Sequence, residues 1–339
     1  MPSAKRITAL ALVVLAATSA GVLTACGSGG EEAKLTVYTS REAEYIEPLT
    51  ERFERQTGIE LDVRYGDAAE LAATIIEEGD NTPADVFWAQ DAGVLGTLDR
   101  KGMFDRLPSD VLDRVPARFR AANGDWVGTS GRSRVVAYST QSLQRSDLPD
   151  SILDFTDPKW KGKIGWTPTN GSFQAFVTAL RLSEGERTAA EWLRGIVANE
   201  PQAFESNEAV RDAIANGEVE VGFINHYYVV KAKDEYGKDY PVAMYVPPGG
   251  DAGALVNAAG VGKLMGSENP DSLRFIRFLL SDPSQRYFAD ALEEYPLVPG
   301  VEADSRLTPL DEIVQPDVTL AELWDLDGTL KLLKETGAL

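Results

Sequence analysis

Two adjacent tyrosines, Tyr227 and Tyr228, are the residues of this chain whose types and spacing are best suited to chemistry. They follow an apolar run, residues 219–224, that predicts a buried strand. In an open α/β sheet, ligands bind outside the carboxyl ends of strands, and two phenols there can bind a hard, highly charged cation as phenolates. A free tyrosine titrates at about 10, but a bound metal ion favours the deprotonated form. Two packing rings or an aromatic lid would produce the same pair, so other features must decide between these interpretations.

The other reactive residue types are scarce. His226 is the single histidine and Cys26 the single cysteine, so a Cys/His zinc site and an intramolecular disulfide are both excluded. A Ser-His-Asp triad would have to use His226, and the chain has no Gly-x-Ser-x-Gly elbow, Walker loop or dinucleotide fingerprint. We therefore expect no enzyme, and a lipid-anchored hydrolase using His226 with a nearby serine is the enzymatic alternative.

The N-terminus predicts export. Lys5 and Arg6 precede an apolar stretch, residues 7–22, and Leu23-Thr24-Ala25-Cys26 follows. A charged start, an apolar centre and small residues at the cut define a secretory signal. The ending resembles the bacterial lipoprotein signal, which predicts a signal peptide over residues 1–25, lipidation of Cys26, and a flexible tether over 26–33. The alternative is an ordinary secretion signal with an unrelated cysteine.

Composition and charge narrow the class of partner. Apolar residues make up 43% of the chain and charged residues 25%, as expected for a folded globular protein. The formal net charge is −20, and removing a signal that contains Lys5 and Arg6 makes it more negative. This acidity argues against nucleic acid and against electrostatic attachment to anionic lipid.

The remaining chain predicts two α/β lobes. The first hundred residues alternate strand and helix patterns in the order βαβαβ, which implies parallel strands with right-handed crossovers. These strands are expected at residues 35–38, 61–65 and 84–88, and the helices around 45–53 and 71–76. The second half predicts a loop at 131–134, strands at 135–138, 163–166 and 219–224, helices at 173–182 and 207–214, and a strand at 255–261 that returns to the first lobe.

Polar loops follow several predicted strands. They lie at residues 39–42, 66–67, 89–91, 170–172 and 225–228, so each lobe contributes some of them. A site that two lobes share favours hinge closure over a ligand.

Several stretches resemble one known family, the ferric-iron-binding solute receptors of ATP-driven bacterial importers, also called the bacterial transferrin group. The matches follow the family's order over nearly the whole mature chain. They are residues 35–38 (LTVY), 83–87 (PADVF), 130–136 (SGRSRVV), 157–162 (DPKWKG), 224–228 (INHYY) and 294–297 (EYPL).

The resemblance implies a two-lobed clamshell of the type II periplasmic-binding-protein kind. Each lobe would be a mainly parallel sheet flanked by helices, in a chain that crosses between the lobes more than once. The boundaries we expect are residues 34–133 plus 257–307 for lobe 1, and 134–256 plus 308–339 for lobe 2.

The resemblance also implies iron ligands. Two adjacent tyrosines hold Fe(III) in the family, and they match Tyr227 and Tyr228. Hard oxygen donors suit a hard trivalent ion. Glu42 stands where some members have a histidine ligand, and Gln90 where many have a glutamate. Glu42 can donate oxygen, whereas Gln90 is neutral and a poorer donor. The spare oxygen donors of the first lobe are Tyr65, Asp67 and Asp91.

An anion such as carbonate or phosphate commonly completes the iron site of this family. Its pocket matches Asn170, Gly171 and Ser172 at a predicted helix start, with Asn207 and Asn225 nearby. Free N–H groups at a helix N-terminus form a ready anion site, although the same residues could be only a cap and turn. Arg132 is a candidate second clamp, because a guanidinium can grip such an anion with two hydrogen bonds. Arg134 is expected to connect structural elements at the junction of the lobes rather than to bind cargo.

Together these features predict an extracytoplasmic lipoprotein, held at the cell membrane through Cys26, that carries Fe(III) to an ABC-type importer. Its partners would be the permease and its ATPase, and the protein would be a monomer that binds no nucleic acid. A receptor of the same fold for a phosphonate, thiamine, a polyamine or sulfate is the main alternative, which Gln90 leaves open.

Overall fold

A computed structural model of the protein describes residues 34–339. No helix in this range is long and apolar enough to cross a membrane. The predicted signal peptide, the lipidation of Cys26 and the tether to residue 33 lie outside the described residues.

The described residues form a mixed α/β fold. The strands are β1 Leu35–Thr39, β2 Leu61–Tyr65, β3 Val86–Ala89, β4 Val127–Ser139, β5 Ile164–Trp166, β6 Gln202–Ala203, β7 Val221–Asn225, β8 Val242–Tyr245, β9 Val256–Lys263 and β10 Tyr295–Pro296. The α-helices are α1 Ala43–Thr57, α2 Ala68–Glu78, α3 Ala92–Arg100, α4 Ser109–Leu112, α5 Gly171–Glu184, α6 Glu186–Ala198, α7 Asn207–Asn216, α8 Tyr227–Tyr236, α9 Asp271–Leu279, α10 Asp282–Leu292 and α11 Leu326–Thr336.

The strands run in the order β2-β1-β3-β9-β4-β7-β5-β6, and β8 and β10 also pair with β4. Strand β1 is parallel to β2 and β3, and β5 is parallel to β6 and β7. Every antiparallel pair involves β4 or β9. The α/β class is therefore confirmed, with parallel strands at the two ends of the order and the long antiparallel strands between them.

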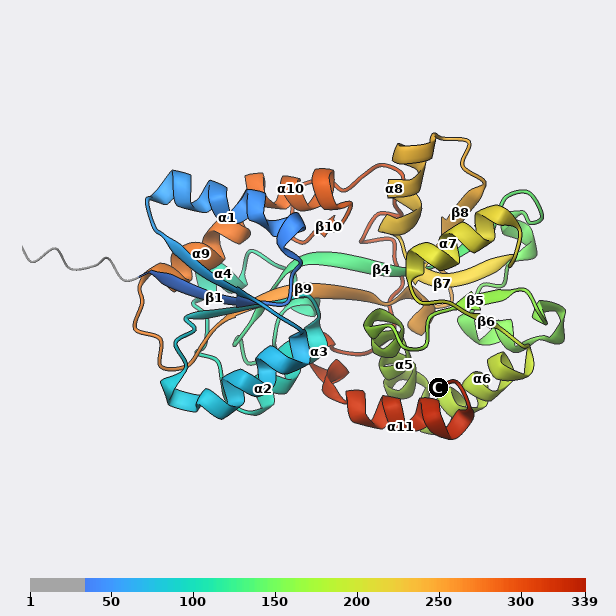
Figure 1. The fold of residues 1–339 in the computed structure, drawn as a ribbon, viewed down its shortest axis with the longest axis horizontal. Coiled ribbons are helices and arrows are strands. Elements are labelled where there is room, and N and C mark those ends of the chain that lie inside the picture. The colour runs from blue at the N-terminus through green and yellow to red at the C-terminus, as the bar shows by residue number, and fades with distance from the viewer. Residues whose placement is uncertain (1–33) are drawn as a thin grey trace, which may run out of the picture. The chain divides into compact units, whose positions relative to one another are not determined.

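Strand β4 changes partners along its length. Residues Val127 to Ser133 pair with β9, whereas Arg134 to Ser139 pair with β7 and β8. One continuous strand thus joins a first group of elements around β1–β3 to a second group around β5–β7. Figure 1 shows β4 and β9 running between these two groups. The lobe boundaries predicted from the sequence stay predictions.

Helices cover both faces of each part of the sheet. Figure 1 shows α1 and α10 on one side of β1 and α2 and α3 on the other. In the second group, α7 and α8 lie on one side of β7 and α5, α6 and α11 on the other. Each helix buries an apolar stripe, as Ile46, Leu49 and Phe53 do in α1. This repeated spacing is the pattern from which the helices were predicted.

The C-terminal segment packs closely on α3. Helix α3 presents Gly93 and Gly96 to the short 3₁₀ helix η7, Leu320–Trp324. A β-carbon on Gly96 would lie only 2.2 Å from the carbonyl oxygen of Ala321. The glycines therefore permit a backbone-to-backbone approach that no larger residue would allow.

Two local predictions were wrong. The segment 131–134, predicted as a basic loop, is the middle of β4 and is fully buried. Its two arginines suggested exposure, but both find hydrogen-bond partners inside the protein. Asn207 was predicted to cap a helix, whereas Ser206 is the N-cap of α7 and accepts a hydrogen bond from the Ala209 amide.

Candidate functional site

The tyrosine pair begins α8, directly after β7. Strand β7 ends at Asn225, and His226 is the N-cap of the helix. The predicted position at the carboxyl end of a strand is therefore correct. The two rings lie 4.3 Å apart between centroids, and the Tyr227 hydroxyl donates a hydrogen bond to the Tyr228 hydroxyl at 3.1 Å. The two phenol oxygens consequently converge on one point.

Without a cation Tyr228 stays protonated. Burial raises the pKa of the Tyr228 phenol far above its ordinary value, and the neighbouring Tyr227 raises it further. A bound metal ion reverses this balance, because its charge favours the phenolate. The half-buried phenols are therefore better suited to binding a strongly charged metal ion than to proton transfer near neutral pH.

Arg134 is a buried cation beside these phenols. From β4 its Nη1 donates to Oδ1 of Asn225 at 2.9 Å and to Oγ of Ser172 at 3.1 Å. Burial lowers the pKa of this guanidinium to about 10, while the charges of Tyr227 and Tyr228 act in the opposite direction. Arg134 remains protonated at neutral pH and places a positive charge next to both oxygens.

The start of α5 lies on the same network. Asn170 is the N-cap of this helix, and its Oδ1 accepts from the Ser172 amide at 3.0 Å and from the Ser172 hydroxyl at 2.6 Å. Gly171 is exposed, with open space where a β-carbon would point. The cap geometry and an exposed helix N-terminus thus occur together, beside the guanidinium of Arg134.

Asn225 and Asn207 each interact with one tyrosine of the pair. The Nδ2 of Asn225 lies 3.5 Å from the Tyr227 hydroxyl, and the side chain of Asn207 hydrogen-bonds to Tyr228. Asn207 is 1% exposed, and its Oδ1 has no hydrogen-bond partner. A buried polar atom without a partner is costly, so a further group at this position would satisfy it.

His226 has a structural role, because both of its ring nitrogens contact backbone groups. It is 1% exposed, its Nδ1 accepts from the Ser133 amide at 3.1 Å, and its Nε2 lies 2.7 Å from the Glu293 carbonyl oxygen. Burial lowers its pKa to about 4, so the ring is neutral. Because both nitrogens are engaged by the backbone, the geometry does not favour a hydrolase that uses this histidine as a base.

The residues expected from the first lobe are less closely placed. Glu42 is exposed and is the N-cap residue of α1, without a side-chain cap hydrogen bond. The Gln90 backbone is held through its amide, which donates to Ser40 Oγ, and through its carbonyl, which accepts from Arg132. Among the described residues, no hydrogen bond or ion pair joins Glu42 or Gln90 to the tyrosine pair, so their assignment as ligands stays a prediction.

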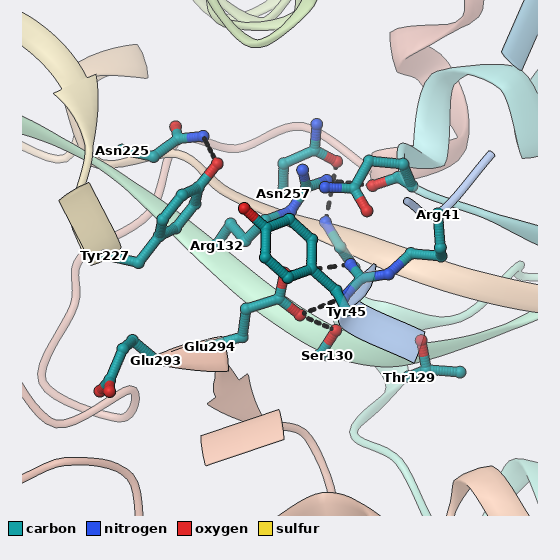
Figure 2. A network of polar contacts seen from close by, with 12 residues as sticks. Arg41, Tyr45, Thr129, Ser130, Arg132, Asn225, Tyr227, Asn257, Glu293 and Glu294 are labelled. Carbon is teal, nitrogen blue, oxygen red and sulfur yellow. Dashed lines mark hydrogen bonds and ion pairs between the residues drawn. The ribbon is translucent and has the colours of Figure 1, made fainter. Parts of the chain in front are cut away.

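Arg132 belongs to a second, buried network. It donates to the Gln90 carbonyl, and its charge acts on Glu294. Arg41 grips the same carboxylate with two hydrogen bonds, at 3.0 and 3.2 Å, and Ser130 adds a third at 2.5 Å. Figure 2 shows this network with Tyr227 and Asn225 to one side. Arg134, rather than Arg132, is therefore the arginine that contacts Ser172 and Asn225.

Of the three spare oxygen donors, Asp67 and Asp91 have other partners, and Tyr65 is 38% exposed. Asp67 caps α2 by accepting from the amides of Ala69 and Glu70. Asp91 caps α3 and also accepts from Asn257. From Lys34 onward, no group of three or more His, Cys, Asp or Glu side chains could hold a metal ion. The converging phenols of Tyr227 and Tyr228 are the candidate metal donors that the structure brings together.

Tyr45 and Lys231 were missed by the sequence reasoning. The ammonium of Lys231 lies 4.6 Å from the ring centroid of Tyr45 and 5.6 Å from that of Tyr227. Lys231 stands one helical turn after Tyr227 in α8, whereas Tyr45 belongs to α1. The i, i+4 spacing of Lys231 was a usable signal, but nothing in the sequence connects α1 to α8.

A pocket of about 640 Å³ lies elsewhere, between residues 117–122 and the segment 313–321. Its charged lining consists of Arg118, Arg120 and Asp317. Arg120 pairs with Asp113 at 3.3 Å. One carboxylate among two guanidinium groups does not suit a hard trivalent cation, so the chemistry favours the tyrosine pair instead.

Comparisons with known proteins agree with this arrangement. The family model described as bacterial extracellular solute-binding protein matches residues 49–318. The major ferric iron-binding protein of Neisseria meningitidis serogroup B is 34% identical over 312 residues, covering 90% of this chain and 93% of that one.

Solved structures show the same fold. Iron-bound HitA from Pseudomonas aeruginosa matches with a TM-score of 0.82 and 32% identity, covering 90% of this chain and 99% of that one. A Trichodesmium protein (IdiA, FutA) in complex with iron and citrate matches with a TM-score of 0.79, 28% identity and the same coverage. The resemblance predicted from the sequence is thereby confirmed, and the chain belongs to the bacterial extracellular solute-binding protein family.

Proposed function

We propose that this protein captures Fe(III) together with a synergistic anion outside the cytoplasm and delivers it to an ABC-type importer. The observation that carries the proposal is the convergence of the Tyr227 and Tyr228 hydroxyls beside the protonated Arg134. Relatives named for ferric iron binding, and a neighbour solved with iron, support it.

Each residue has a role in this proposal. Tyr227 and Tyr228 bind iron as phenolates, and Arg134 stabilises the negative charge that forms when they lose protons. The exposed start of α5 at Gly171 receives the anion, with Ser172 and the guanidinium of Arg134 close by. Free helix N–H groups and the positive helix end favour a carbonate or phosphate there. Citrate is a further candidate, since a relative was solved with it.

Capture and release of the ion would depend on how far water can reach it. Closing the two groups of elements around the ion would exclude water and strengthen its attraction to the phenolates. Reopening at the permease would let water compete for the ion. Glu42 and Gln90 are the first-lobe residues that the resemblance assigns to closure.

The experiment is an absorption titration of the soluble protein, residues 34–339, with ferric citrate and bicarbonate. We expect a visible phenolate-to-Fe(III) charge-transfer band that saturates at one iron per protein. The Tyr227→Phe, Tyr228→Phe double variant should lose this band. Tyr236→Phe, at the exposed far end of α8, is the matched control and should keep it.

The opposite result would redirect the assignment. If no band appears and iron leaves the thermal stability unchanged, iron is not the cargo. A protein stabilised by a phosphonate but not by iron would point to the anion side of the site, around Arg134 and Ser172. Stabilisation by thiamine or a polyamine would instead indicate an organic cation.

The membrane attachment needs its own test. We propose that Cys26 carries a lipid and is the first residue of the mature protein. In the native host, Cys26→Ser should move the protein from the membrane fraction to the soluble fraction. If both forms partition alike, residues 1–25 are an ordinary secretion signal.

A further inference from the structure

The pocket of about 640 Å³ between residues 117–122 and 313–321 has no role in the proposed function. Its volume falls within the range of about 300–1,000 Å³ that is usual for small-molecule sites. A smaller pocket of about 210 Å³ adjoins it, because Arg120, Ala121 and Ala122 line both. We call the larger of the two the arginine pocket, since Arg118 and Arg120 are the cations in its lining.

The charged side chains of the arginine pocket favour an anion. Among the described residues, the guanidinium of Arg118 has no hydrogen-bond or ion-pair partner, and it lies 5.8 Å from the ring centroid of Phe119. Arg120 pairs with Asp113 at 3.3 Å, but this carboxylate is 74% exposed. Exposed ion pairs contribute little free energy, so Arg120 can turn to another carboxylate at small cost. Both guanidinium groups are therefore available to a ligand.

Gln315 adds a hydrogen-bond donor to the same lining. Its Nε2 is buried and has no hydrogen-bond partner within residues 34–339. A buried polar atom without a partner is costly, and the nitrogen of a side-chain amide can only donate. The group that would satisfy it is therefore an acceptor. A carboxylate meets this requirement and also matches the charge of the two arginines.

The rest of the lining is mostly apolar. It consists of Leu255, Ile313, Pro316, Val318 and Leu320 together with four alanines, and of Thr319. Moving apolar surface out of water is favourable, so a ligand with an apolar body would gain affinity there. Asp317 is the one carboxylate in the lining, and with the two arginines it leaves one net positive charge. This balance suits a ligand with a single negative charge.

The arginine pocket is distinct from the tyrosine site but connected to it. None of Tyr227, Tyr228 or Ser172 lines the pocket. Leu255, which does, has a carbonyl oxygen that accepts a hydrogen bond from the Arg134 amide at 2.8 Å. An experiment must therefore show which of the two sites a ligand occupies.

We propose that the arginine pocket is a second ligand site, which binds a small organic monoanion made of a carboxylate on an apolar body. Arg118 and Arg120 bind the carboxylate, Gln315 donates a further hydrogen bond to it, and the apolar lining covers the body. This binding does not depend on iron capture.

The test is a fluorescence titration of the iron-free protein, residues 34–339, with the dye anilinonaphthalene sulfonate. The dye has an apolar ring system with one negative charge, and it fluoresces strongly in apolar surroundings. We expect saturation at one dye per protein and displacement of the dye by octanoate. Inorganic phosphate lacks the apolar body and octylammonium has the opposite charge, so neither should displace the dye at that concentration. Displacement by either one as effectively as by octanoate would overturn the inference.

Two substitutions in the pocket should change the affinity in opposite directions. The Arg118→Gln, Arg120→Gln double variant should bind dye and octanoate at least about 10-fold more weakly, because hydrogen bonds between charged groups are the strong ones. Neither arginine is buried, so this variant should unfold at the same urea concentration as wild type. Asp317→Asn removes a repelling charge and should strengthen the binding of octanoate. Weaker binding by Asp317→Asn would show that the pocket prefers a cation, contrary to the inference.

Arg274→Gln is the matched control for charge. Arg274 is exposed in α9, where it pairs with Asp271 at 3.7 Å, and it does not line the pocket. It should bind dye and octanoate as wild type does. An equal loss of affinity in Arg274→Gln and in the double variant would mean that general surface charge attracts the dye, and the assignment of the pocket would fail.

The Tyr227→Phe, Tyr228→Phe variant separates this inference from the proposed function. It should lose the iron band but keep full binding of dye and octanoate. If it loses the binding of both, the dye occupies the tyrosine site and the second ligand site is refuted, while iron capture stands. If wild type shows no saturable binding of dye and octanoate, the inference is also refuted, whatever the iron titration shows.

Discussion

Arg134 donates a hydrogen bond from Nη1 to the Oγ of Ser172 at 3.1 Å, although the two residues belong to β4 and α5. The same nitrogen also contacts Asn225, at the end of the strand that precedes the tyrosine pair. One buried charge therefore links the proposed anion position to the proposed metal ligands. Iron and anion would then bind cooperatively, because the positive charge of Arg134 attracts both the anion and the phenolates that bind iron.

Arg134 should govern the dependence of iron binding on the anion. A hydrogen bond to a charged group contributes about 1.5–3 kcal/mol, which corresponds to roughly 10–100-fold in affinity. Arg134→Lys keeps the charge but loses the planar fork, so we expect the bicarbonate or phosphate concentration at half-maximal iron binding to rise about 10-fold. The titration is followed by the charge-transfer band at a series of anion concentrations.

Arg132→Lys is the control for that prediction. Arg132 contacts the Gln90 carbonyl and acts on Glu294, away from Ser172. Its substitution should leave the anion dependence nearly unchanged. If Arg132→Lys produces the larger effect, Arg132 is the clamp, as the sequence suggested, and Arg134 is structural.

Iron affinity should rise with pH. Burial holds the pKa of Tyr228 far above neutrality, and a tyrosine that binds iron as a phenolate gives up its proton on binding. Release of two protons makes the affinity increase about 100-fold per pH unit, because one pKa unit corresponds to a tenfold change for each group. Competition against a chelator of known protonation behaviour between pH 6 and 8 measures this slope.

The Tyr228→Phe variant provides the comparison for the pH slope. It should retain weak binding with a smaller slope, since one titrating phenol is gone. An affinity that does not vary with pH would show that the phenols stay protonated in the complex and are not ligands.

The buried pair of Arg41 and Glu294 should stabilise the iron-free protein. Both side chains are almost fully buried, and the carboxylate also accepts from Ser130. Removing one partner of a buried pair costs about 3–5 kcal/mol. We therefore expect Glu294→Gln to lower the free energy of unfolding at pH 7 by about 3 kcal/mol, measured by urea denaturation with tryptophan fluorescence.

The pH dependence of this contribution has a definite sign. Burial acts to raise the pKa of Glu294, but the charges of Arg41 and Arg132 outweigh it and hold the pKa below its usual value. The stabilisation is therefore present above the unfolded-state pKa, about 4.3, and is lost as the pH falls through the folded-state pKa. Wild type and Glu294→Gln should converge in acid. Glu51→Gln, which removes an exposed partner of Arg55, should change stability by less than about 0.5 kcal/mol at any pH.

Gly96→Ala should disrupt the packing of α3 on the C-terminal segment. The new methyl group would lie 2.2 Å from the Ala321 carbonyl oxygen, and a backbone atom cannot move aside easily. Overpacking of this kind costs about 1–3 kcal/mol, which denaturation of the iron-free protein would detect. Unchanged stability would mean that η7 can shift to accommodate the methyl group. The close approach of α3 and η7 would then contribute little to the free energy of unfolding.

The sequence by itself determined the fold class and the place of the tyrosine pair. Apolar periodicity predicted most strands and helices, because burial on one face leaves a regular pattern in the chain. The position of Tyr227 after a buried strand followed from the same pattern, since the local order of elements needs no distant contacts.

Only the tertiary structure decided which charged residues surround the pair. The basic run at 131–134 looked like a loop, because composition does not reveal that distant carbonyl and amide groups hydrogen-bond its arginines inside a strand. The choice of Arg134 beside Ser172, and the approach of Tyr45 to Tyr227 through Lys231, both depend on elements far apart in the chain. Such contacts arise from the packing of α1, β4 and α5 around the sheet, and no local pattern encodes them.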